Sequence, residues 1–135
     1  MFLFDTDILS SIAKPRPSPL LIRKLALVPQ RLRFTSTITV GEIYFGAFRV
    51  DRGPAILEYF EERIFPSLAI LPFDLESARI FGRVKARLEK AGAIISDTDL
   101  FIAAVALRHG MTLVTGNIKH FAGIPRLKVE NWIGD

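Results

Sequence analysis

Four acidic side chains lie where apolar segments of this chain end or begin: Asp5, Glu42, Asp97 and Asp99. Each alone is ordinary, but together, in a small basic protein, they suggest a cation site built from oxygen ligands. Carboxylates are the usual ligands of hard divalent cations, and a cation held in this way commonly serves to attack a phosphodiester. The pattern therefore suggests a metal-dependent nuclease.

Composition favours one domain, residues 1–135, with a large core. Half of the 135 residues are apolar, including 11 Phe. The net charge of +4 with a pI near 9.8 either simply keeps the protein soluble or indicates an anionic partner such as nucleic acid. The absence of Cys excludes disulfides and thiolate metal sites and fits a cytoplasmic protein. The first residues lack the basic region of a signal peptide, and the longest apolar run, Leu100–Leu107, is too short to span a membrane.

Short apolar segments alternate with helical patterns along the chain, which predicts an α/β fold with a parallel sheet covered by helices on both faces. The expected strands are 2–4, 32–36, 68–71, 111–115 and 127–130. The expected helices are 20–28, capped by Ser18 with Pro19 at the first position, and 39–50, 53–65, 75–91 and 98–109.

This topology predicts that the acids converge. Ligands of parallel sheets bind outside the carboxyl ends of the strands. Asp5 and Asn117 follow strands, whereas Glu42 and Asp99 lie in the first turns of helices expected to begin near the same edge. Two like charges 4 Å apart cost about 4 kcal/mol at an effective dielectric constant of 20, and a divalent cation would remove that cost. Asn117 adds a neutral oxygen.

Each acid also has a structural interpretation. Thr39-x-x-Glu42 and Ser96-x-x-Asp99 both match a capping box, in which the acid reaches back to the start of its helix. Asp97 could be an exposed acid favoured by the helix dipole. Asp5 or Asp7 could be a turn residue.

Three other functions compete with the metal nuclease. His109 and His120 could support metal-free acid–base cleavage of RNA. The segment Asp5-Thr6-Asp7 resembles the opening motif of haloacid-dehalogenase-type phosphatases, although the later lysine and acidic pair of that family are not found. A non-enzymatic module that binds RNA or a protein partner through a silent site is the third. The serines have no partnered base, so a hydrolase triad is unsupported.

Basic residues recur on one face of the expected helix 75–91. Arg79, Arg83, Arg87 and Lys90 are spaced by three or four residues. Such a face either is simply solvated or contacts phosphates of a nucleic acid.

The ordered set of motifs resembles PIN domains, and among them the VapC-type toxins of type II toxin–antitoxin pairs. The resemblance covers nearly the whole chain. It rests on four segments: Phe-Leu-Phe-Asp5-Thr-Asp-Ile-Leu, Ile-Thr-Val-Gly-Glu42-Ile, Asp99-Leu-Phe-Ile-Ala-Ala and Leu-Val-Thr115-Gly-Asn117-Ile-Lys-His-Phe.

The resemblance implies a three-layer α/β/α fold and a Mg²⁺- or Mn²⁺-dependent endoribonuclease that is neutralised by a VapB-like antitoxin and is commonly a homodimer. By position, Asp5, Glu42 and Asp99 match the three core acids. Asn117 matches a fourth position that is Asp in many members, and Asp97 is the residue that could restore that charge. Asp7 replaces the usual Asn of the opening motif, which adds charge at the rim.

The mechanism expected for such a site is in-line attack on the RNA phosphate by a metal-activated water. Asp5 and Asp99 are the expected direct ligands, Glu42 ligates the metal or holds the water, and Asn117 orients water or substrate. Cleavage by water predicts 5′-phosphate and 3′-hydroxyl products. Segments 20–28 and 43–48 are either a docking surface for the antitoxin or part of the core.

Overall fold

Five strands form one parallel sheet in the order β3-β2-β1-β4-β5, in a computed structural model that describes residues 1–134. The strands are β1 (Phe2–Phe4), β2 (Arg33–Ser36), β3 (Ala69–Leu71), β4 (Thr112–Val114) and β5 (Val129–Glu130). Every neighbouring pair is parallel. The predicted parallel sheet is therefore confirmed, and all five strands overlap the expected segments.

The central strands are apolar on both faces because helices cover both faces. Leu3 and Phe4 of β1 pair with Leu113 and Val114 of β4, and these four side chains have no exposed surface. Leu3 and Leu113 point into one core cluster, whereas Phe4 and Val114 point into the other. The alternation places consecutive residues of each strand in opposite layers.

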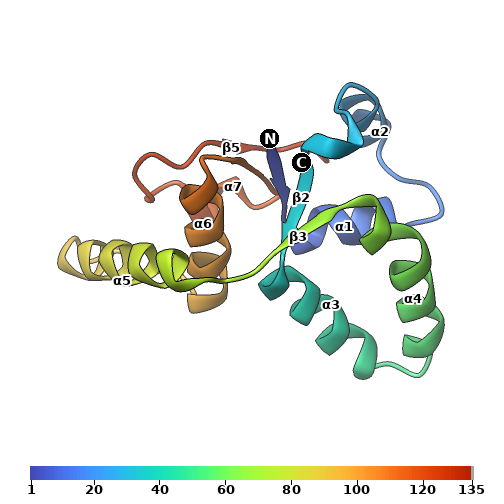
Figure 1. Ribbon diagram of the computed structural model, residues 1–135, viewed down its shortest axis with the longest axis horizontal. Coiled ribbons are helices and arrows are strands. Elements are labelled where there is room, and N and C mark those ends of the chain that lie inside the picture. Colours follow the sequence, from blue (N-terminus) through green and yellow to red (C-terminus); the bar gives the residue numbers. More distant parts are fainter. Residues whose placement is uncertain (135) are drawn as a thin grey trace.

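Seven α-helices are described: α1 (Thr6–Ile12), α2 (Pro19–Ala26), α3 (Thr37–Phe48), α4 (Gly53–Tyr59), α5 (Leu75–Lys90), α6 (Asp97–His109) and α7 (Ile118–Phe121). A 3₁₀ turn, Gln30–Leu32, precedes β2. Helices α5 and α6 lie on one side of the sheet, and α1, α2 and α4 lie on the other (Figure 1). This arrangement is the three-layer α/β/α fold that the resemblance implies.

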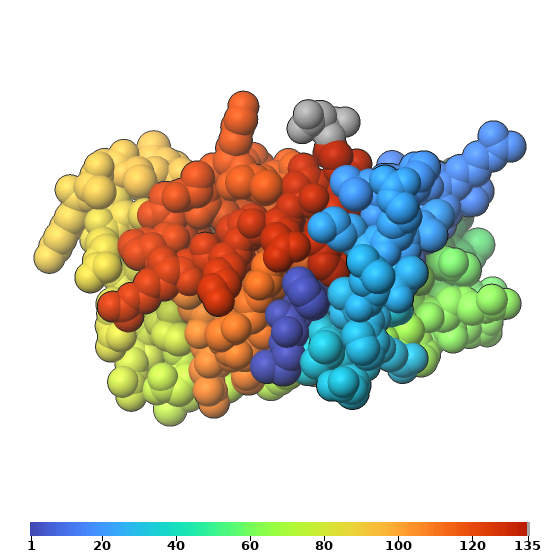
Figure 2. All heavy atoms as spheres, turned by 90° about the horizontal axis from the view of Figure 1, so that it is seen from above, coloured from blue at the N-terminus to red at the C-terminus, as the bar shows by residue number. Residues whose placement is uncertain are grey.

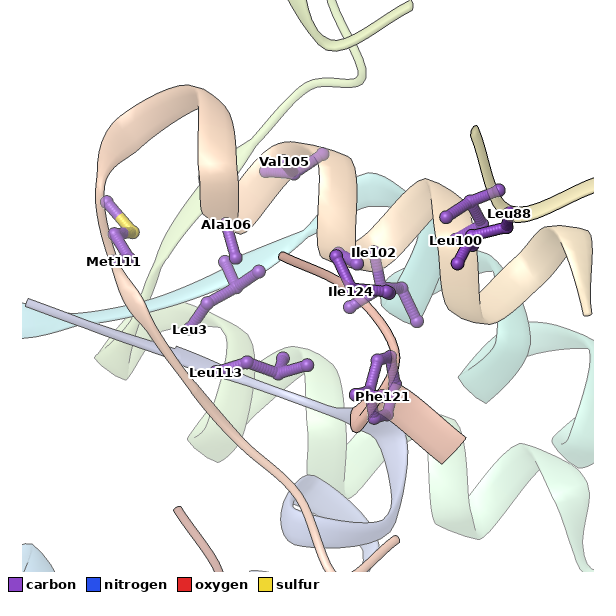
Figure 3. Close-up of a cluster of buried hydrophobic side chains, with 11 residues drawn as sticks. Leu3, Leu88, Leu100, Ile102, Val105, Ala106, Met111, Leu113, Phe121 and Ile124 are labelled. Carbon is purple, nitrogen blue, oxygen red and sulfur yellow. The ribbon is translucent and has the colours of Figure 1, made fainter. Parts of the chain in front are cut away.

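Helix α6 supplies most of the first core layer. Its residues Ile102, Ala103, Val105 and Ala106 have no exposed surface and pack with Leu3 and other buried side chains (Figure 3). The helix ends at Gly110, whose φ of 64° is in the left-handed region that glycine adopts without steric cost. The packing fixes the position of α6, and therefore of the acids in its first turn.

Three predicted details of the helices are wrong. The segment 53–65 is one helix in the prediction, but α4 ends at Tyr59 and is followed by a π-helical turn, Phe60–Ile64, and a 3₁₀ turn, Phe65–Ser67. The third helix begins at Thr37, two residues earlier than expected. Helices α1 and α7 are absent from the prediction, because seven and four residues are too short to display a helical period.

No helix within residues 1–134 has the length and apolar character needed to cross a membrane.

Candidate active site

Asp5 is held at the carboxyl end of β1 by hydrogen bonds to both carboxylate oxygens. The backbone N–H of Thr6 donates to Oδ1 at 2.7 Å, and the hydroxyl of Thr115 donates to Oδ2 at 2.8 Å. The Asp5 side chain caps the N-terminus of α1, and Thr115 directly follows β4. Only 5% of Asp5 is exposed, so the paired strands and the start of α1 together fix one carboxylate orientation.

The surroundings of Asp5 disfavour its negative charge. Burial raises the pKa of Asp5, the hydrogen bonds from Thr115 and Thr6 lower it, and the charges of Asp7 and Asp99 raise it, so that the resulting pKa is about 6. The pKa of Asp7 is also raised, chiefly by burial and further by the charge of Asp99. Asp5, Asp7 and Asp99 thus form a cluster of like charges in which, among the described residues, only Asp99 has an ion-pair partner, His120.

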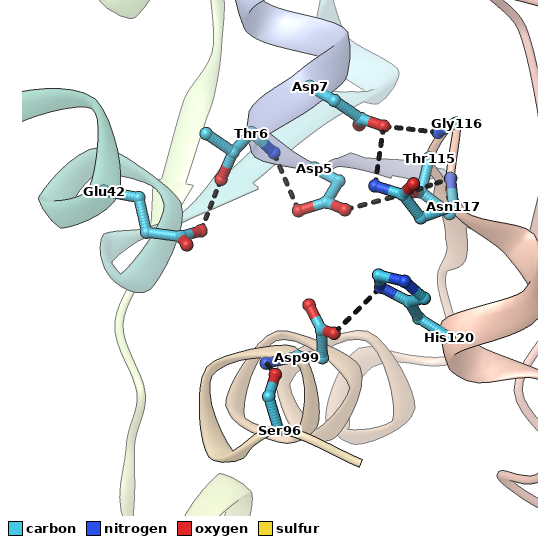
Figure 4. Close-up of polar contacts among 10 residues, drawn as sticks. All are labelled: Asp5, Thr6, Asp7, Glu42, Ser96, Asp99, Thr115, Gly116, Asn117 and His120. Carbon is cyan, nitrogen blue, oxygen red and sulfur yellow. Dashed lines mark hydrogen bonds and ion pairs between the residues drawn. The ribbon is translucent and has the colours of Figure 1, made fainter. Parts of the chain in front are cut away.

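Asp7 fastens the loop that follows β4. Its Oδ2 accepts hydrogen bonds from the backbone N–H of Gly116 at 2.7 Å and from the side-chain amide of Asn117 at 3.3 Å (Figure 4). Its Oδ1 is buried without a hydrogen-bond partner. A Cβ added at Gly116 would lie 2.7 Å from Asp7 Oδ2, so the close approach requires glycine. The carboxylate therefore orients Asn117 and leaves one oxygen unsatisfied.

Glu42 points from α3 toward the start of α1, where its Oε1 accepts a hydrogen bond from the Thr6 hydroxyl (Figure 4). The predicted capping box with Thr39 is wrong. Ser36 is the cap of α3, and its hydroxyl accepts from Thr39 N–H at 3.1 Å. Glu42 consequently lies in the second turn of the helix, which frees its carboxylate to face the Asp5 region.

Asp99 faces Asp5 from the first turn of α6. Ser96 caps this helix as predicted, accepting a hydrogen bond from Asp99 N–H at 3.2 Å. The Asp99 carboxylate does not complete a capping box but pairs with His120 Nδ1 at 3.3 Å. Its side chain is 24% exposed and is drawn opposite Asp5 in Figure 4.

Asp97 has a different partner. Its carboxylate accepts a hydrogen bond from Lys85 Nζ of α5 at 3.0 Å, and both side chains are largely solvent-accessible. The contacts that join Asp5, Asp7 and Asp99 do not include Asp97. Its participation in metal binding remains a prediction.

The structure also reveals neighbours of the acids that the sequence did not single out. The Thr6 hydroxyl donates to Glu42, and the Thr115 hydroxyl donates to Asp5. His120 pairs with Asp99. From the sequence alone, His120 is indicated only as a group for acid–base cleavage without metal. Thr6 lies between Asp5 and Asp7, which is a local signal, whereas Thr115 has no acid in its own motif and is brought to Asp5 only by the pairing of β4 with β1.

The donor chemistry fits a hydrated Mg²⁺ or Mn²⁺ ion. Carboxylate, hydroxyl and amide oxygens converge around Asp5, and the charge of the cluster would be relieved by a cation. Within residues 1–134, no group of three or more His, Cys, Asp or Glu side chains forms a ready metal cage. Mg²⁺ commonly keeps several waters and binds through one or two carboxylates, so an open donor set of this kind suffices.

Comparison with known proteins agrees with this geometry. Residues 2–127 match the PIN domain. The chain is 35% identical over 135 residues to ribonuclease VapC2 of Haemophilus influenzae, covering 98% of each protein, and 29% identical over 134 residues to the tRNA(fMet)-specific endonuclease VapC of Salmonella typhimurium, covering 97% of each. The solved structure of VapBC2 from Rickettsia felis, bound to a promoter DNA fragment, has a TM-score of 0.87 at 28% identity and covers 97% of this chain and 98% of that one.

The chain therefore belongs to the PIN-domain family. Within that family it is a VapC-type ribonuclease toxin of a toxin–antitoxin system, as the resemblance implied. The haloacid-dehalogenase alternative is thereby set aside.

Proposed function

We propose that the chain is a Mg²⁺- or Mn²⁺-dependent endoribonuclease whose reaction takes place at the acids around Asp5. The observation that carries this proposal is the buried Asp5 carboxylate, fixed by Thr6 and Thr115 and made less acidic by burial and by Asp7 and Asp99. A site that maintains such unfavourable charge at a strand end favours a cation as its ligand. The names of the Haemophilus and Salmonella relatives, a ribonuclease and a tRNA endonuclease, support RNA as the substrate.

Asp5 and Asp99 are the proposed metal ligands, and Glu42 either completes the set or holds the attacking water. A bound Mg²⁺ or Mn²⁺ would lower the pKa of a coordinated water and neutralise charge on the phosphate. In this proposal Glu42 accepts a proton from that water, and the hydrogen bond from the Thr6 hydroxyl to its carboxylate supports this role by holding the side chain. Asn117, fixed by Asp7, orients water or the RNA, and Asp97 remains a proposed additional ligand.

The proposed partner besides RNA is a VapB-like antitoxin, because neighbours of this fold were solved as VapBC complexes. Large apolar side chains are exposed in the two segments expected to receive it: Ile22, Leu27, Phe45 and Phe48. Burying such side chains against a partner is favourable at about 25 cal/mol per Å² of apolar surface. We also propose a homodimer, and a cytoplasmic setting in which the RNA is accessible.

The first experiment is incubation of the purified, antitoxin-free protein with total RNA and Mn²⁺ or Mg²⁺. Parallel reactions contain EDTA or the Asp5→Asn variant. Metal-dependent cleavage that both controls lose, with 5′-phosphate and 3′-hydroxyl ends, is the expected result. Ends carrying 2′,3′-cyclic phosphate would contradict this mechanism and favour metal-free acid–base cleavage by the histidines. RNA binding by folded protein with no cleavage under any metal would favour the silent module.

A further inference from the structure

A pocket with basic walls lies at the end of the sheet opposite the acids. It has a volume of about 530 Å³ and is formed by α5, the C-terminal end of α6 and the segment that leads into β5. Two of its residues, Met111 and Lys128, directly precede β4 and β5, whereas Asp5 and Thr115 directly follow strands. The pocket and the acids therefore lie at opposite ends of the same parallel strands.

Four cationic side chains line this pocket: Arg83, Arg87, Arg126 and Lys128. All four residues are exposed, and none forms an ion pair with an acid within residues 1–134. Three other basic residues of α5 and α6 have such partners, whereas Lys90 of α5 has none among the described residues. Arg79 pairs with Glu76, Lys85 with Asp97 and Arg108 with Asp74. The positive charge of the pocket is thus uncompensated, and an anionic ligand would relieve the repulsion.

The predicted basic face of α5 is divided by these contacts. Arg79 belongs to a local ion pair, whereas Arg83 and Arg87 meet Arg126 and Lys128 across the pocket. In Figure 2, the orange-red segment that leads to β5 lies beside the yellow residues of α5, and a Cβ at Gly123 would contact Leu88 at 3.9 Å. The basic groups therefore come from two segments about forty positions apart in sequence, brought together by the fold.

The walls of the pocket also contain apolar surface. Val84, Leu107, Met111 and Pro125 contribute to the lining. A volume of this size is typical of sites for small organic ligands. Apolar walls beside guanidinium groups suit a nucleotide, whose base can pack on apolar surface and guanidinium planes while its phosphate accepts paired hydrogen bonds from arginine.

Arg126 has an unusual backbone conformation. Its φ of 69° makes it the one non-glycine residue with positive φ among residues 1–134. Such conformations are uncommon for residues with a Cβ and recur at ligand sites, where the surrounding structure maintains them. Arg126 follows Pro125 in a turn, and both residues line the pocket, so this conformation directs the turn to the pocket wall independently of charge.

We propose that this pocket, defined by Arg83, Arg87, Arg126 and Lys128, is a second RNA-binding site that holds a nucleotide and flanking phosphates of the substrate away from the cleavage point. The proposal rests on the proposed function, because it takes the same RNA as ligand. Helix α6 connects the two sites: from Asp99 to Gly110 it rises about 16 Å at about 1.5 Å per residue. A folded RNA such as tRNA is large enough to reach both.

RNA binding to the pocket is tested in an Asp5→Asn background, which prevents cleavage. Unfractionated tRNA is titrated at several salt concentrations into this parent and into a variant that also carries Arg87→Gln and Arg126→Gln. Loss of two phosphate contacts should reduce the slope of log K against log salt by about two and weaken binding about tenfold or more. Arg16→Gln with Arg31→Gln is the matched control, because it removes the same charge from exposed positions outside the pocket.

Equal tRNA affinity and equal salt slope in the pocket variant and its parent would overturn the proposal, as would an equal loss in the control pair. An acidic protein segment as the true occupant would produce the first of these results. Thermal unfolding of each variant verifies that it is folded. The isolated substitutions Arg87→Gln and Arg126→Gln provide the same test if the double variant does not fold.

The outcome separates this proposal from the proposed function. If the unsubstituted protein cleaves RNA but the pocket variant binds tRNA as tightly as its Asp5→Asn parent, only the proposal of a second RNA-binding site is contradicted. If no RNA is cleaved but the pocket variant still binds tRNA more weakly, the nuclease proposal fails and the second site stands.

Discussion

The hydroxyl of Thr115 donates a 2.8 Å hydrogen bond to Asp5 Oδ2, joining residues 110 positions apart. The same hydroxyl oxygen accepts a hydrogen bond from the backbone N–H of Asn117 at 3.1 Å. Thr115 is fully buried, and its N–H donates to the carbonyl of Glu130 at 3.0 Å. One side chain thus connects the acid at the end of β1 with the loop that carries Asn117, and the backbone of β5 holds it in place.

Thr115→Val should destabilise the protein and make Asp5 still less acidic. Valine has nearly the shape of threonine but cannot donate, so a buried carboxylate oxygen loses its partner at a cost of about 1–3 kcal/mol. Because the Thr115 hydrogen bond lowers the pKa of Asp5, its loss should raise that pKa above its present value of about 6. Urea unfolding and the pH dependence of RNA cleavage measure the two effects. Thr115→Ser retains the hydroxyl and should stay close to the parent in both.

The stability of the metal-free protein should fall as pH rises from about 4 to about 7. The folded-state pKa of Asp5 is about 6, above the ordinary value of 3.8, so folded protein binds the proton more tightly than unfolded protein. This contribution is fully present below pH 3.8 and is lost as pH rises through about 6, by an amount on the order of 3 kcal/mol. Urea unfolding in EDTA measures the effect. Asp5→Asn should show a shallower fall, and parallel curves for the two proteins would contradict the assignment.

Mn²⁺ or Mg²⁺ should raise the melting temperature, because it binds the native acid cluster and not the unfolded chain. Asp99→Asn should raise the metal-free melting temperature by removing a charge that disfavours ionised Asp5 and Asp7, and it should abolish cleavage. Differential scanning calorimetry with and without metal tests both. Asp51→Asn, at an exposed turn, is the control for loss of one acid. The absence of any shift would mean that Asp99 is a helix-start residue and not a ligand.

The main features of the site could be predicted, because they depend on strand and helix boundaries and these can be recognised from the local sequence. Asp5 and Asn117 follow β1 and β4, and the carboxyl ends of parallel strands lie at the same edge of a sheet. The two possible caps of α3, Ser36 and Thr39, cannot be distinguished locally. The helix begins directly after β2, and this tertiary arrangement selects Ser36. Glu42 was therefore assigned to the wrong turn of its helix.

Other contacts could not be predicted because they join distant residues in one particular geometry. The hydrogen bond from Thr115 to Asp5 and the two from the Gly116 loop to Asp7 depend on the register of β4 against β1. The ion pair of Asp97 with Lys85 depends on how α5 crosses α6. Residue types indicate which groups could interact, but only the packed elements decide which do.

Gly116→Ala should reduce cleavage by displacing the loop that holds Asn117. The added Cβ would lie 2.6 Å from Ile133 Cδ1 and 2.7 Å from Asp7 Oδ2, so either the loop or these two side chains must shift, and either movement weakens the 2.7 Å hydrogen bond from Gly116 N–H to Asp7. A loss of about 1–3 kcal/mol in stability is expected, together with a lower kcat. Gly82→Ala is the control, because a Cβ there meets nothing within 4 Å and alanine within α5 should stabilise the protein by about 1 kcal/mol.

The Asp7→Asn variant shows whether Asp7 supports cleavage by positioning the Gly116–Asn117 loop or by its negative charge. Asparagine keeps an oxygen that can accept from Gly116 N–H but removes the negative charge. A lower kcat in Gly116→Ala with a nearly unchanged kcat in Asp7→Asn would mean that Asp7 acts by positioning Asn117. An equal loss in both, accompanied by weaker Mn²⁺ binding in Asp7→Asn, would mean instead that the unpartnered Oδ1 of Asp7 contributes to the metal site.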